Sequence, residues 1–591
     1  MLAGGGAQSY SVLGLTMVGR TFAALEVTDM TVQESPAPVH RSASLKREIG
    51  LVGLTWASMG SIIGSGWLFG AQKGLLAAGP AAIISWLIGG VMIMVLALVH
   101  AELGGMYPVS GGTARFPHYA FGGAAGASFG WFSWLQAATV APIEVSAMIT
   151  YGQHYSFAHS WLDPKTGVLT GSGVIVAVIL MAILTAINFL GIKRLAATNS
   201  AATWWKIAIP LLTILVLAIA TTHTSNFHAA NGFNPDGFHG ILAAVSTSGI
   251  IFSYLGFEQA DQLAGEAKNP RRDLPIAIIA SILLGMVIYI ALQVVFLLAL
   301  PSGAIGSTWS STAAHTFSTF TGPFAEIATL ASIGWLAAVI YADAIISPAG
   351  TGLIYTTGSS RVSYGLSRNG YIPTPFEWVN KNGVPWVGLI AAFVTGCICF
   401  LPFPSWQSLV GLITSASVLM YAGAPLSLGV FRRRLPNAVR PYRLPMASVL
   451  SPLAFIISGL IILWSGWVTD WKLGVAILIG YAILALSRGL HLNDKPTHLN
   501  WRAASWLPVY LVGMGVIVFF SSFGPTRTLA NGTTTDPHQI WGDYTGILIT
   551  AVFSLVIYYW AMAVSLSGDE IEEMVNEVVL PEEEGLAAPV H

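Results

Sequence analysis

Four ionisable side chains lie inside long apolar stretches of the sequence: Lys206, Glu144, Glu258 and Asp343. Such a group is costly at membrane depth, so it usually faces the interior of a helix bundle, where it marks an ion pathway or a paired structural contact. A desolvated lysine either releases its proton or stays charged beside a carboxylate. Either behaviour lets a proton take the place of a sodium ion, so Lys206 and Glu258 are the candidate proton-coupling residues.

Simpler interpretations of these four groups stay open. Lys206 lies within two turns of the end of its apolar run and could extend its ammonium group to the membrane surface. Glu258 could be a buried carboxyl that is hydrogen-bonded to a neighbouring helix. Glu144 and Asp343 are best explained as structural acids, although Asp343 could also line an outer vestibule.

Metal and covalent chemistry find no support in the sequence. The two cysteines, Cys397 and Cys399, are two residues apart in an apolar run, where they cannot form an ordinary disulfide or a four-ligand metal site. There is no His-Glu-x-x-His motif either. We therefore expect no metal, no cofactor and no enzymatic activity.

Two stretches of the sequence predict interruptions in membrane helices. The first is Ser61-Ile62-Ile63-Gly64-Ser65-Gly66, because two glycines around a serine continue a helix poorly. The second is Phe252-Ser253-Tyr254-Leu255-Gly256-Phe257-Glu258. A lone Gly-x-Gly more often only permits close helix packing. Free N–H groups at the start of a half-helix, however, suit a carboxylate.

The whole chain is built for a membrane. Of its 591 residues, 54% are hydrophobic and 9% are charged, and the mean hydropathy is +0.68. Apolar runs predict about 14 spanning helices, since each needs about 20 apolar residues. The runs cover residues 49–73, 80–101, 126–151, 173–191, 199–221, 241–264, 274–300, 324–356, 386–401, 407–430, 450–468, 471–487, 506–523 and 545–566.

The spacing of the two interruptions indicates an internal repeat. They fall in the first and the sixth predicted helix, as expected if two five-helix halves form an inverted repeat that each begins with a broken helix. We predict an all-α polytopic fold with a ten-helix core at 48–430 and four accessory helices at 431–567. Residues 1–47 are predicted to be a disordered cytoplasmic tail, and residues 568–591 an acidic cytoplasmic tail.

Basic residues predict the orientation of the helices, because Lys and Arg accumulate on the cytoplasmic side. With the N-terminus inside, only Lys73, Lys165, Lys472 and Arg527 of the 26 basic residues fall outside, and Lys206 falls within a span. One missed helix would invert every later loop. The distribution therefore predicts a multi-pass protein of the plasma membrane with both termini in the cytoplasm.

The motifs Ile62-Ile63-Gly64-Ser65-Gly66, Gly256-Phe257-Glu258 and Lys268-Asn269-Pro270-Arg271-Arg272 resemble those of the amino acid–polyamine–organocation permeases. The resemblance covers about residues 49 to 430. It implies that Ile63, Gly64, Ser65 and Gly66 receive a substrate carboxylate. It also implies that Phe252, Ser253, Leu255 and Gly256 form the opposite side of the site, with Phe252 as an aromatic gate.

Further segments are similar to the branch of bacterial aspartate:proton symporters: Gly64-Ser65-Gly66-Trp67-Leu68-Phe69, Asp343-Ala344-Ile345-Ile346-Ser347-Pro348, Leu401-Pro402-Phe403-Pro404-Ser405-Trp406 and Trp464-Ser465-Gly466-Trp467. Lys206 resembles the lysine that replaces a sodium ion in proton-coupled members. Glu258 matches an acid that is linked to proton or substrate release in an exchanger branch, and it stands where the symporter branch carries a histidine.

The resemblance implies secondary transport of an amino acid, with proton-coupled uptake of aspartate or glutamate favoured. An amino acid exchanger of the same fold and a transporter-like amino acid sensor are the alternatives. The expected partners are an amino acid, protons and the lipid bilayer, without nucleic acid. The sequence leaves the oligomeric state open.

Overall fold

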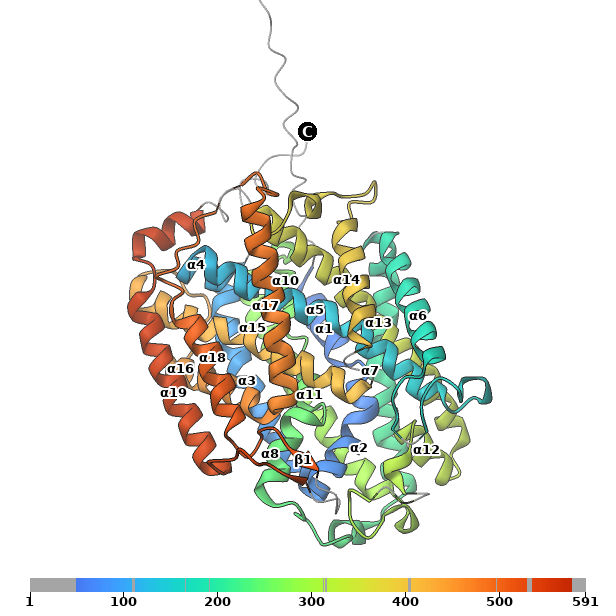
Figure 1. Ribbon diagram of the computed structural model, residues 1–591. Helices are drawn as coiled ribbons and strands as arrows, with labels where there is room; N and C mark the ends of the chain where they lie inside the picture. The colour runs from blue at the N-terminus through green and yellow to red at the C-terminus, as the bar shows by residue number, and fades with distance from the viewer. Residues whose placement is uncertain are drawn as a thin grey trace, which may run out of the picture. The chain divides into compact units, whose positions relative to one another are not determined.

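The computed structural model describes residues 49–108, 112–164, 166–190, 192–311, 313, 316–401, 405–495, 497–528 and 534–576, with the side chains of 192–202 excluded. The two predicted tails, 1–47 and 568–591, therefore lie outside the described residues, apart from 568–576 at the start of the second. Within the described ranges, nine helices are long and apolar enough to cross a membrane. The fold is that of an all-α polytopic membrane protein (Figure 1).

The first predicted half of the core contains one interrupted helix followed by four continuous ones and a short helix, α4. Their bounds are α1 (Leu51–Ile62), α2 (Gly66–Ala78), α3 (Ala82–Met106), α4 (Gly112–Phe121), α5 (Gly123–Gly152), α6 (Gly171–Phe189) and α7 (Ile192–Ala220).

The second half repeats this order with an interrupted helix, a continuous one, a short helix and three further long helices. Their bounds are α8 (Gly237–Thr247), α9 (Ile250–Tyr254), α10 (Glu258–Gln262), α11 (Pro270–Ala299), α12 (Pro323–Leu330), α13 (Gly334–Arg368), α14 (Trp386–Cys399) and α15 (Trp406–Arg434). The predicted apolar runs of the core thus coincide with one helix or with an interrupted helix, except that the run 324–356 covers the short helix α12 and the first part of α13.

The remaining predicted runs form α16 (Ala447–Ser465), α17 (Trp467–Gly489), α18 (Trp506–Phe519) and α19 (Asp543–Val564). A two-stranded antiparallel ribbon, β1 (Arg527–Thr528) and β2 (Thr534–Thr535), lies between α18 and α19. Seven short 3-10 helices join the longer elements: η1 (Gly79–Ala81), η2 (Ser156–Ala158), η3 (Thr224–His228), η4 (Ala264–Glu266), η5 (Ser302–Ala304), η6 (Phe317–Thr319) and η7 (Thr374–Glu377).

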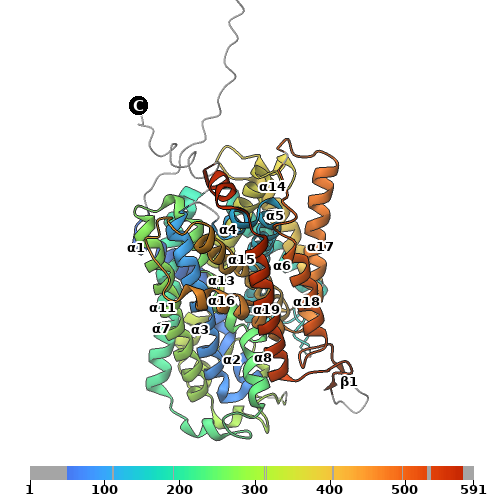
Figure 2. The same ribbon diagram turned by 90° about the vertical axis from the view of Figure 1, so that its left-hand side faces the viewer.

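Helix α15 forms the centre of the bundle, since its most apolar 18-residue window is entirely buried. It begins with a capping box, in which the Ser405 hydroxyl accepts the backbone N–H of Ser408 and the Ser408 hydroxyl accepts that of Ser405. Helices α16, α17 and α19 pack against it, and Figure 2 shows α17 and α18 on the right of the view. Because α15 is covered on all sides, it tolerates serines and threonines that a lipid-facing helix would not.

A buried ion cluster fastens the end of α15 to α3. Glu102 of α3 is fully buried and accepts hydrogen bonds from Arg432 Nε at 2.7 Å and from the Leu444 backbone N–H at 2.7 Å. Arg440 Nε lies 3.2 Å from the same carboxylate. This cluster joins the core to the connection that leads into α16.

Candidate functional site

Both predicted interruptions occur in the structure. Helix α1 ends at Ile62 and α2 begins at Gly66, so Ile63, Gly64 and Ser65 form the first interruption. In the second half, α9 ends at Tyr254 and α10 begins at Glu258. Gly256 in the second interruption has φ +124°, a backbone conformation that favours glycine.

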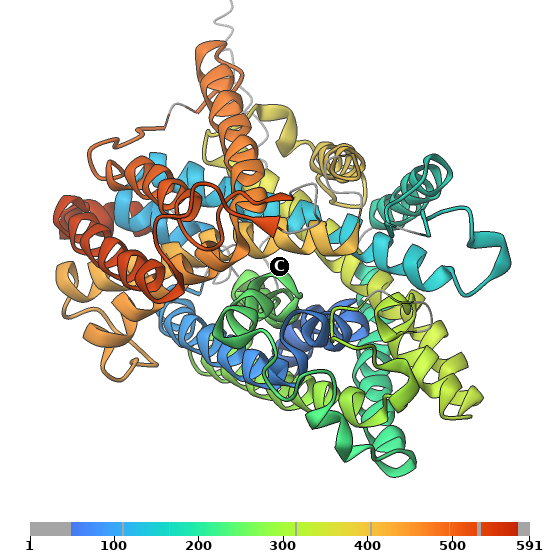
Figure 3. The same ribbon diagram turned by 60° about the horizontal axis from the view of Figure 1, so that its bottom comes forward.

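The two interruptions lie against each other. A Cβ atom added to Gly256 would stand 2.7 Å from Ser61 Cβ and 2.8 Å from the Ile62 backbone nitrogen. A Cβ atom on Gly66 would overlap Ser253 Oγ in the same way. Figure 3 shows the early blue helices and the green helices of the second half side by side. Only glycine therefore permits this approach of the two backbones.

The backbone groups that the first interruption frees are satisfied by side chains from three other helices. In a continuous helix, the carbonyl oxygens of Gly60 and Ile62 would accept from Gly64 and Gly66. Instead, the Gly60 oxygen accepts from Lys206 Nζ and the Ile62 oxygen accepts from Tyr289 at 2.7 Å. The Ser65 N–H donates to Glu144 Oε2 at 2.9 Å.

Lys206 is fully buried, so the interpretation that it extends to the membrane surface is wrong. Besides the Gly60 oxygen, its ammonium group donates to Thr351 Oγ1 at 2.6 Å. The acids whose charges act on it are Glu144 and Asp343. The lysine thus sits among oxygen atoms at the first interruption.

Glu144 belongs to the site more closely than the sequence suggested. It is fully buried on α5, and its Oε1 has no hydrogen-bond partner among the described residues. A Cβ atom on Gly64 would lie 2.6 Å from that oxygen, which explains the glycine. The Glu144 carboxylate therefore accepts the hydrogen bond of the Ser65 N–H, a group that the sequence predicts to bind a substrate carboxylate.

Glu258 is held by four donors. Its Oε1 accepts from Gln136 Nε2 at 3.0 Å and from Tyr355 at 3.1 Å. Its Oε2 accepts from Tyr421 at 2.6 Å and from the Gly256 N–H at 2.9 Å. The carboxyl is fully buried and fixes the backbone of the second interruption, as the alternative interpretation of a hydrogen-bonded buried acid expects.

Asp343 behaves as a structural acid. It is fully buried, and its two oxygens accept from Trp67 Nε1 at 3.0 Å and from Ser347 at 2.6 Å. The bond from Trp67 ties α13 to α2, whereas the bond from Ser347 lies within α13. The buried position does not fit a residue that lines an outer vestibule.

A cavity of about 10 Å³ separates the two interruptions, which is the room needed by one water molecule. It is lined by ten residues: Ser61, Ile62, Gly64, Val140, Glu144, Phe252, Leu255, Thr351, Tyr355 and Ile413. Of the predicted substrate residues, Gly64, Phe252 and Leu255 are in this lining. An amino acid is far larger, so this conformation is closed around the site.

The other predicted substrate residues lie next to the cavity without lining it. Ile63 caps the end of α1, and Gly66 begins α2 against Ser253. The Ser253 hydroxyl donates to the Gly249 oxygen at 2.7 Å, within its own helix. Gly256 contacts the backbone of α1, as described above.

Aromatic side chains cover one side of the cavity. Trp406, the first residue of α15, donates its indole N–H to Ser65 Oγ at 2.9 Å. Its ring centroid lies 4.9 Å from that of Phe69 and 6.0 Å from that of Phe252. Phe252 therefore packs at the cavity together with Trp406, a partner that the sequence did not reveal, and its role as a gate stays a prediction.

Several lining residues escaped prediction because no local pattern marks them. Val140 with Glu144, and Thr351 with Tyr355, are each four residues apart and so share one helix face. The sequence signal that could have found them is an apolar helix face that carries one acid or hydroxyl per turn. Which face meets the interruptions, however, depends on contacts distant in sequence.

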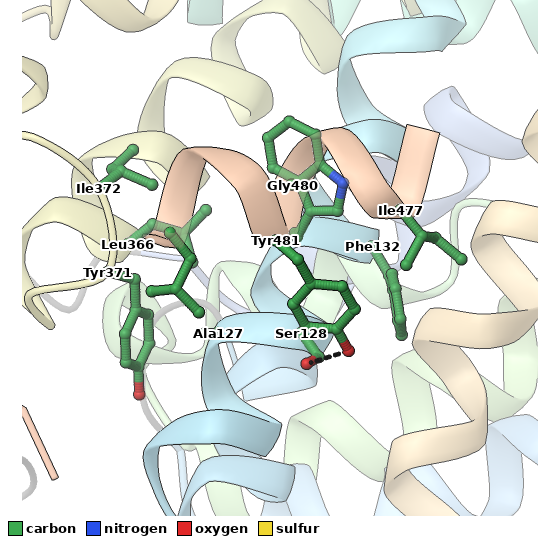
Figure 4. Close-up of a pocket in the computed structure, with 11 residues that line it drawn as sticks. Ala127, Ser128, Phe132, Leu366, Tyr371, Ile372, Ile477, Gly480 and Tyr481 are labelled. Carbon is green, nitrogen blue, oxygen red and sulfur yellow. Dashed lines mark hydrogen bonds between the residues drawn. The ribbon is translucent and has the colours of Figure 1, made fainter. Parts of the chain in front are cut away.

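A second cavity, of about 20 Å³, lies away from this site between α5, α13 and α17 (Figure 4). Its lining is mostly apolar and aromatic, and Ser128 and Tyr481 form a hydrogen bond of 2.9 Å across it. The described lining carries no carboxylate and no amine. This cavity is a packing gap between α17 and the core.

Comparison with known proteins shows the family of the chain. Residues 49–484 match the family model described as amino acid permease. The glutamate/serine transporter AimA of Bacillus subtilis is 35% identical over 524 residues, which cover 88% of this chain and 94% of the relative. The aspartate-proton symporter of the same organism is 33% identical over 88% of this chain and 97% of the relative.

A third relative, the branched-chain amino acid permease BcaP of Bacillus subtilis, is 28% identical over 78% of this chain and 97% of its own length. All three relatives are matched over nearly their whole length, and the matched part of this chain is longer than the predicted ten-helix core. The resemblance seen in the motifs is therefore confirmed. The chain belongs to the amino acid permease family and is a multi-pass membrane transporter of amino acids, not an enzyme.

Proposed function

We propose that this protein is a secondary active transporter that couples amino acid uptake across the plasma membrane to protons, by alternating access. Aspartate and glutamate are the favoured substrates, and both termini face the cytoplasm. The observation that carries the proposal is the position of the Lys206 ammonium group on oxygens at the first interruption.

Unwound backbone in transporters of this architecture supplies carbonyl oxygens that coordinate sodium ions or protonated groups. Here the Gly60 carbonyl and the Thr351 hydroxyl face a covalently attached cation instead of a free one. A buried lysine can lose and regain its charge. A proton on Lys206 therefore takes the role that a sodium ion would otherwise have.

The substrate carboxylate binds, in this proposal, to the backbone N–H groups of Gly64, Ser65 and Gly66, with Ile63 shaping the turn before them. Glu144 now accepts from the Ser65 N–H and must leave it for the substrate to bind. Because the charge of Glu144 also acts on Lys206, substrate arrival and the charge of the lysine become linked.

The opposite side of the site is formed by Phe252, Ser253, Leu255 and Gly256, which receive the amino group. Glu258 contributes to coupling through Tyr355, because Tyr355 both lines the cavity and donates to Glu258. A substrate that shifts Tyr355 therefore changes the hydrogen bonding of a buried acid.

The substrate preference is supported by two relatives, whose names specify glutamate and serine in one case and aspartate in the other. Backbone groups recognise only the part that all amino acids share. Competition between one labelled acidic amino acid and a panel of unlabelled ones measures the preference. Equal competition by neutral amino acids would contradict it.

The coupling is tested by uptake of labelled glutamate into proteoliposomes under an imposed pH gradient or an imposed sodium gradient. We expect uptake to follow the pH gradient, and Lys206→Met to lose this response while the variant stays folded. The matched control is Thr213→Val, which removes a buried hydroxyl of the same helix whose hydrogen bond stays within that helix. Uptake driven equally well by sodium alone would refute proton coupling.

The same vesicles separate the alternatives. An exchanger requires unlabelled amino acid inside, whereas a symporter accumulates label in empty vesicles. A sensor binds the amino acid without flux. We expect net accumulation in empty vesicles.

A further inference from the structure

A buried acid lies one turn beyond Glu258 on α10, the short helix that follows the second interruption. Asp261 on α10 is 1% exposed, and neither of its carboxyl oxygens has a hydrogen-bond partner among the described residues. The carboxyl packs against the backbone of α3, because a Cβ atom on Gly104 would overlap Asp261 Oδ1. Unlike Glu258, this acid therefore has nothing in the described structure that compensates a negative charge.

The charged and titratable groups on the elements around Asp261 do not supply that compensation. Helices α3 and α4 carry His100, Glu102, Arg115, His118 and Tyr119. The η4 turn and the start of α11 carry Glu266, Arg271, Arg272 and Asp273, whereas α1 carries none.

Several of these groups are engaged elsewhere. Glu102 pairs with Arg432 and Arg440, Glu266 pairs with Arg361, and His118 bonds to Tyr371. The titratable group that acts on Asp261 is Glu258 itself. An ionised Asp261 would be an unpaired buried charge beside a second carboxylate, which costs several kcal/mol.

The element that carries Asp261 is short and is interrupted at both ends. Helix α10 has five residues, with the second interruption before it and η4 after it. Its far end is tied to the start of α1, because Ile49 N–H donates to the Glu266 oxygen at 3.0 Å and Lys268 N–H donates to the Ile49 oxygen at 2.8 Å. Ser58 of α1 also donates to the Phe257 oxygen at 3.2 Å. Helix α1 and helix α10 are therefore joined as one body, with the two interruptions as its hinges.

We infer that Asp261 is a proton-binding site on the predicted cytoplasmic side, distinct from Lys206, that controls closure of that side. With its proton, the carboxyl packs against Gly104 and the α1–α10 body closes. When the body swings away from α3, the O–H bond breaks, the proton passes to water and the carboxylate remains hydrated. Closure then requires a proton from the same side, so transport slows when that side becomes alkaline. The inference takes its side of the membrane from the proposed orientation and does not require proton-coupled uptake.

Amino acid exchange in right-side-out membrane vesicles tests the inference, with internal pH varied and external pH fixed. We expect the wild-type exchange rate to fall by up to about tenfold for each unit by which internal pH rises, because binding of a single proton allows no steeper dependence. Asp261→Asn, the neutral isostere of the acid, should exchange at a rate independent of internal pH. If that variant fails to fold, Asp261→Ser provides a smaller neutral replacement with the same expected flat profile.

The matched control is Asp470→Asn. Asp470 is a half-buried acid with one unpartnered oxygen among the described residues, but it lies on α17 and accepts a hydrogen bond from Ser415. This control should keep the wild-type profile. A wild-type profile in the Asp261 variants, or a flat profile in the wild type, would overturn the inference. Failure of the proposed proton coupling would be seen in a different measurement, because wild-type uptake would then not respond to an imposed pH gradient.

Discussion

Gly256→Ala tests the contact between the two interruptions directly. The backbone at this position has φ +124°, which strains any residue with a Cβ atom by about 1–3 kcal/mol. The added Cβ would also stand 2.8 Å from the Ile62 nitrogen, and backbone atoms cannot swing aside as a side chain can. Overpacking of this kind costs about 1–3 kcal/mol more. We expect a total loss of about 3 kcal/mol or more in the free energy of unfolding.

The assay is thermal unfolding of the purified protein in detergent, paired with uptake in proteoliposomes. Gly256→Ala should lower the unfolding temperature clearly and abolish uptake, because α10 can no longer approach α1. The control is Gly365→Ala in α13, where an added Cβ meets no atom within 4 Å. This helical substitution should be neutral or stabilise by up to about 1 kcal/mol. Equal unfolding temperatures and equal uptake in the two variants would refute the claimed contact.

Three further substitutions probe the site and its support. Glu144→Gln keeps an acceptor for the Ser65 N–H but removes the competing charge, so equilibrium binding of glutamate should tighten about fivefold; unchanged or weaker binding would contradict this role. Trp406→Phe and Ser65→Ala remove the same hydrogen bond, so a double-mutant cycle on substrate binding should give a coupling energy of about 1 kcal/mol, and strict additivity would exclude the contact. Glu102→Gln leaves Arg432 and Arg440 without their anion and should lower stability by about 3 kcal/mol, measured as loss of monodisperse protein on heating; a wild-type heating curve would show that the cluster is dispensable.

Local sequence was sufficient to predict the interruptions. Gly64-Ser65-Gly66 and Gly256 break apolar runs where a helix would otherwise continue, and a helix break depends mainly on residues close in the chain. The element order follows from the apolar runs and the family resemblance from the short motifs, and they agree with the structure and the comparisons respectively. The predicted tails lie outside the described residues, apart from 568–576.

The partners of the charged groups could not be predicted in this way. Nothing near Lys206 in the sequence indicates that it reaches the Gly60 carbonyl, 146 positions away. Likewise, the sequence presents Glu144 as a structural acid, because its partner, the Ser65 N–H, is 79 positions away. Such pairs depend on how the two halves pack, which one sequence does not reveal.

Ser253 shows a different limit. Its place in the motif suggested a substrate contact, but in this closed conformation its hydroxyl bonds within its own helix and its side chain packs against Gly66. A residue at a helix interruption can serve either backbone packing or ligand binding, and the same small polar side chain suits both. Only the packed structure distinguishes the two.

The central claim is that the two interruptions together form the amino acid site. An experimental structure of the protein with bound glutamate tests it most directly. We predict ligand density between Gly64-Ser65-Gly66 and Leu255, with the α-carboxylate on the backbone N–H groups and Glu144 moved off the Ser65 N–H. Ligand density elsewhere, with Glu144 still bonded to Ser65, would contradict it.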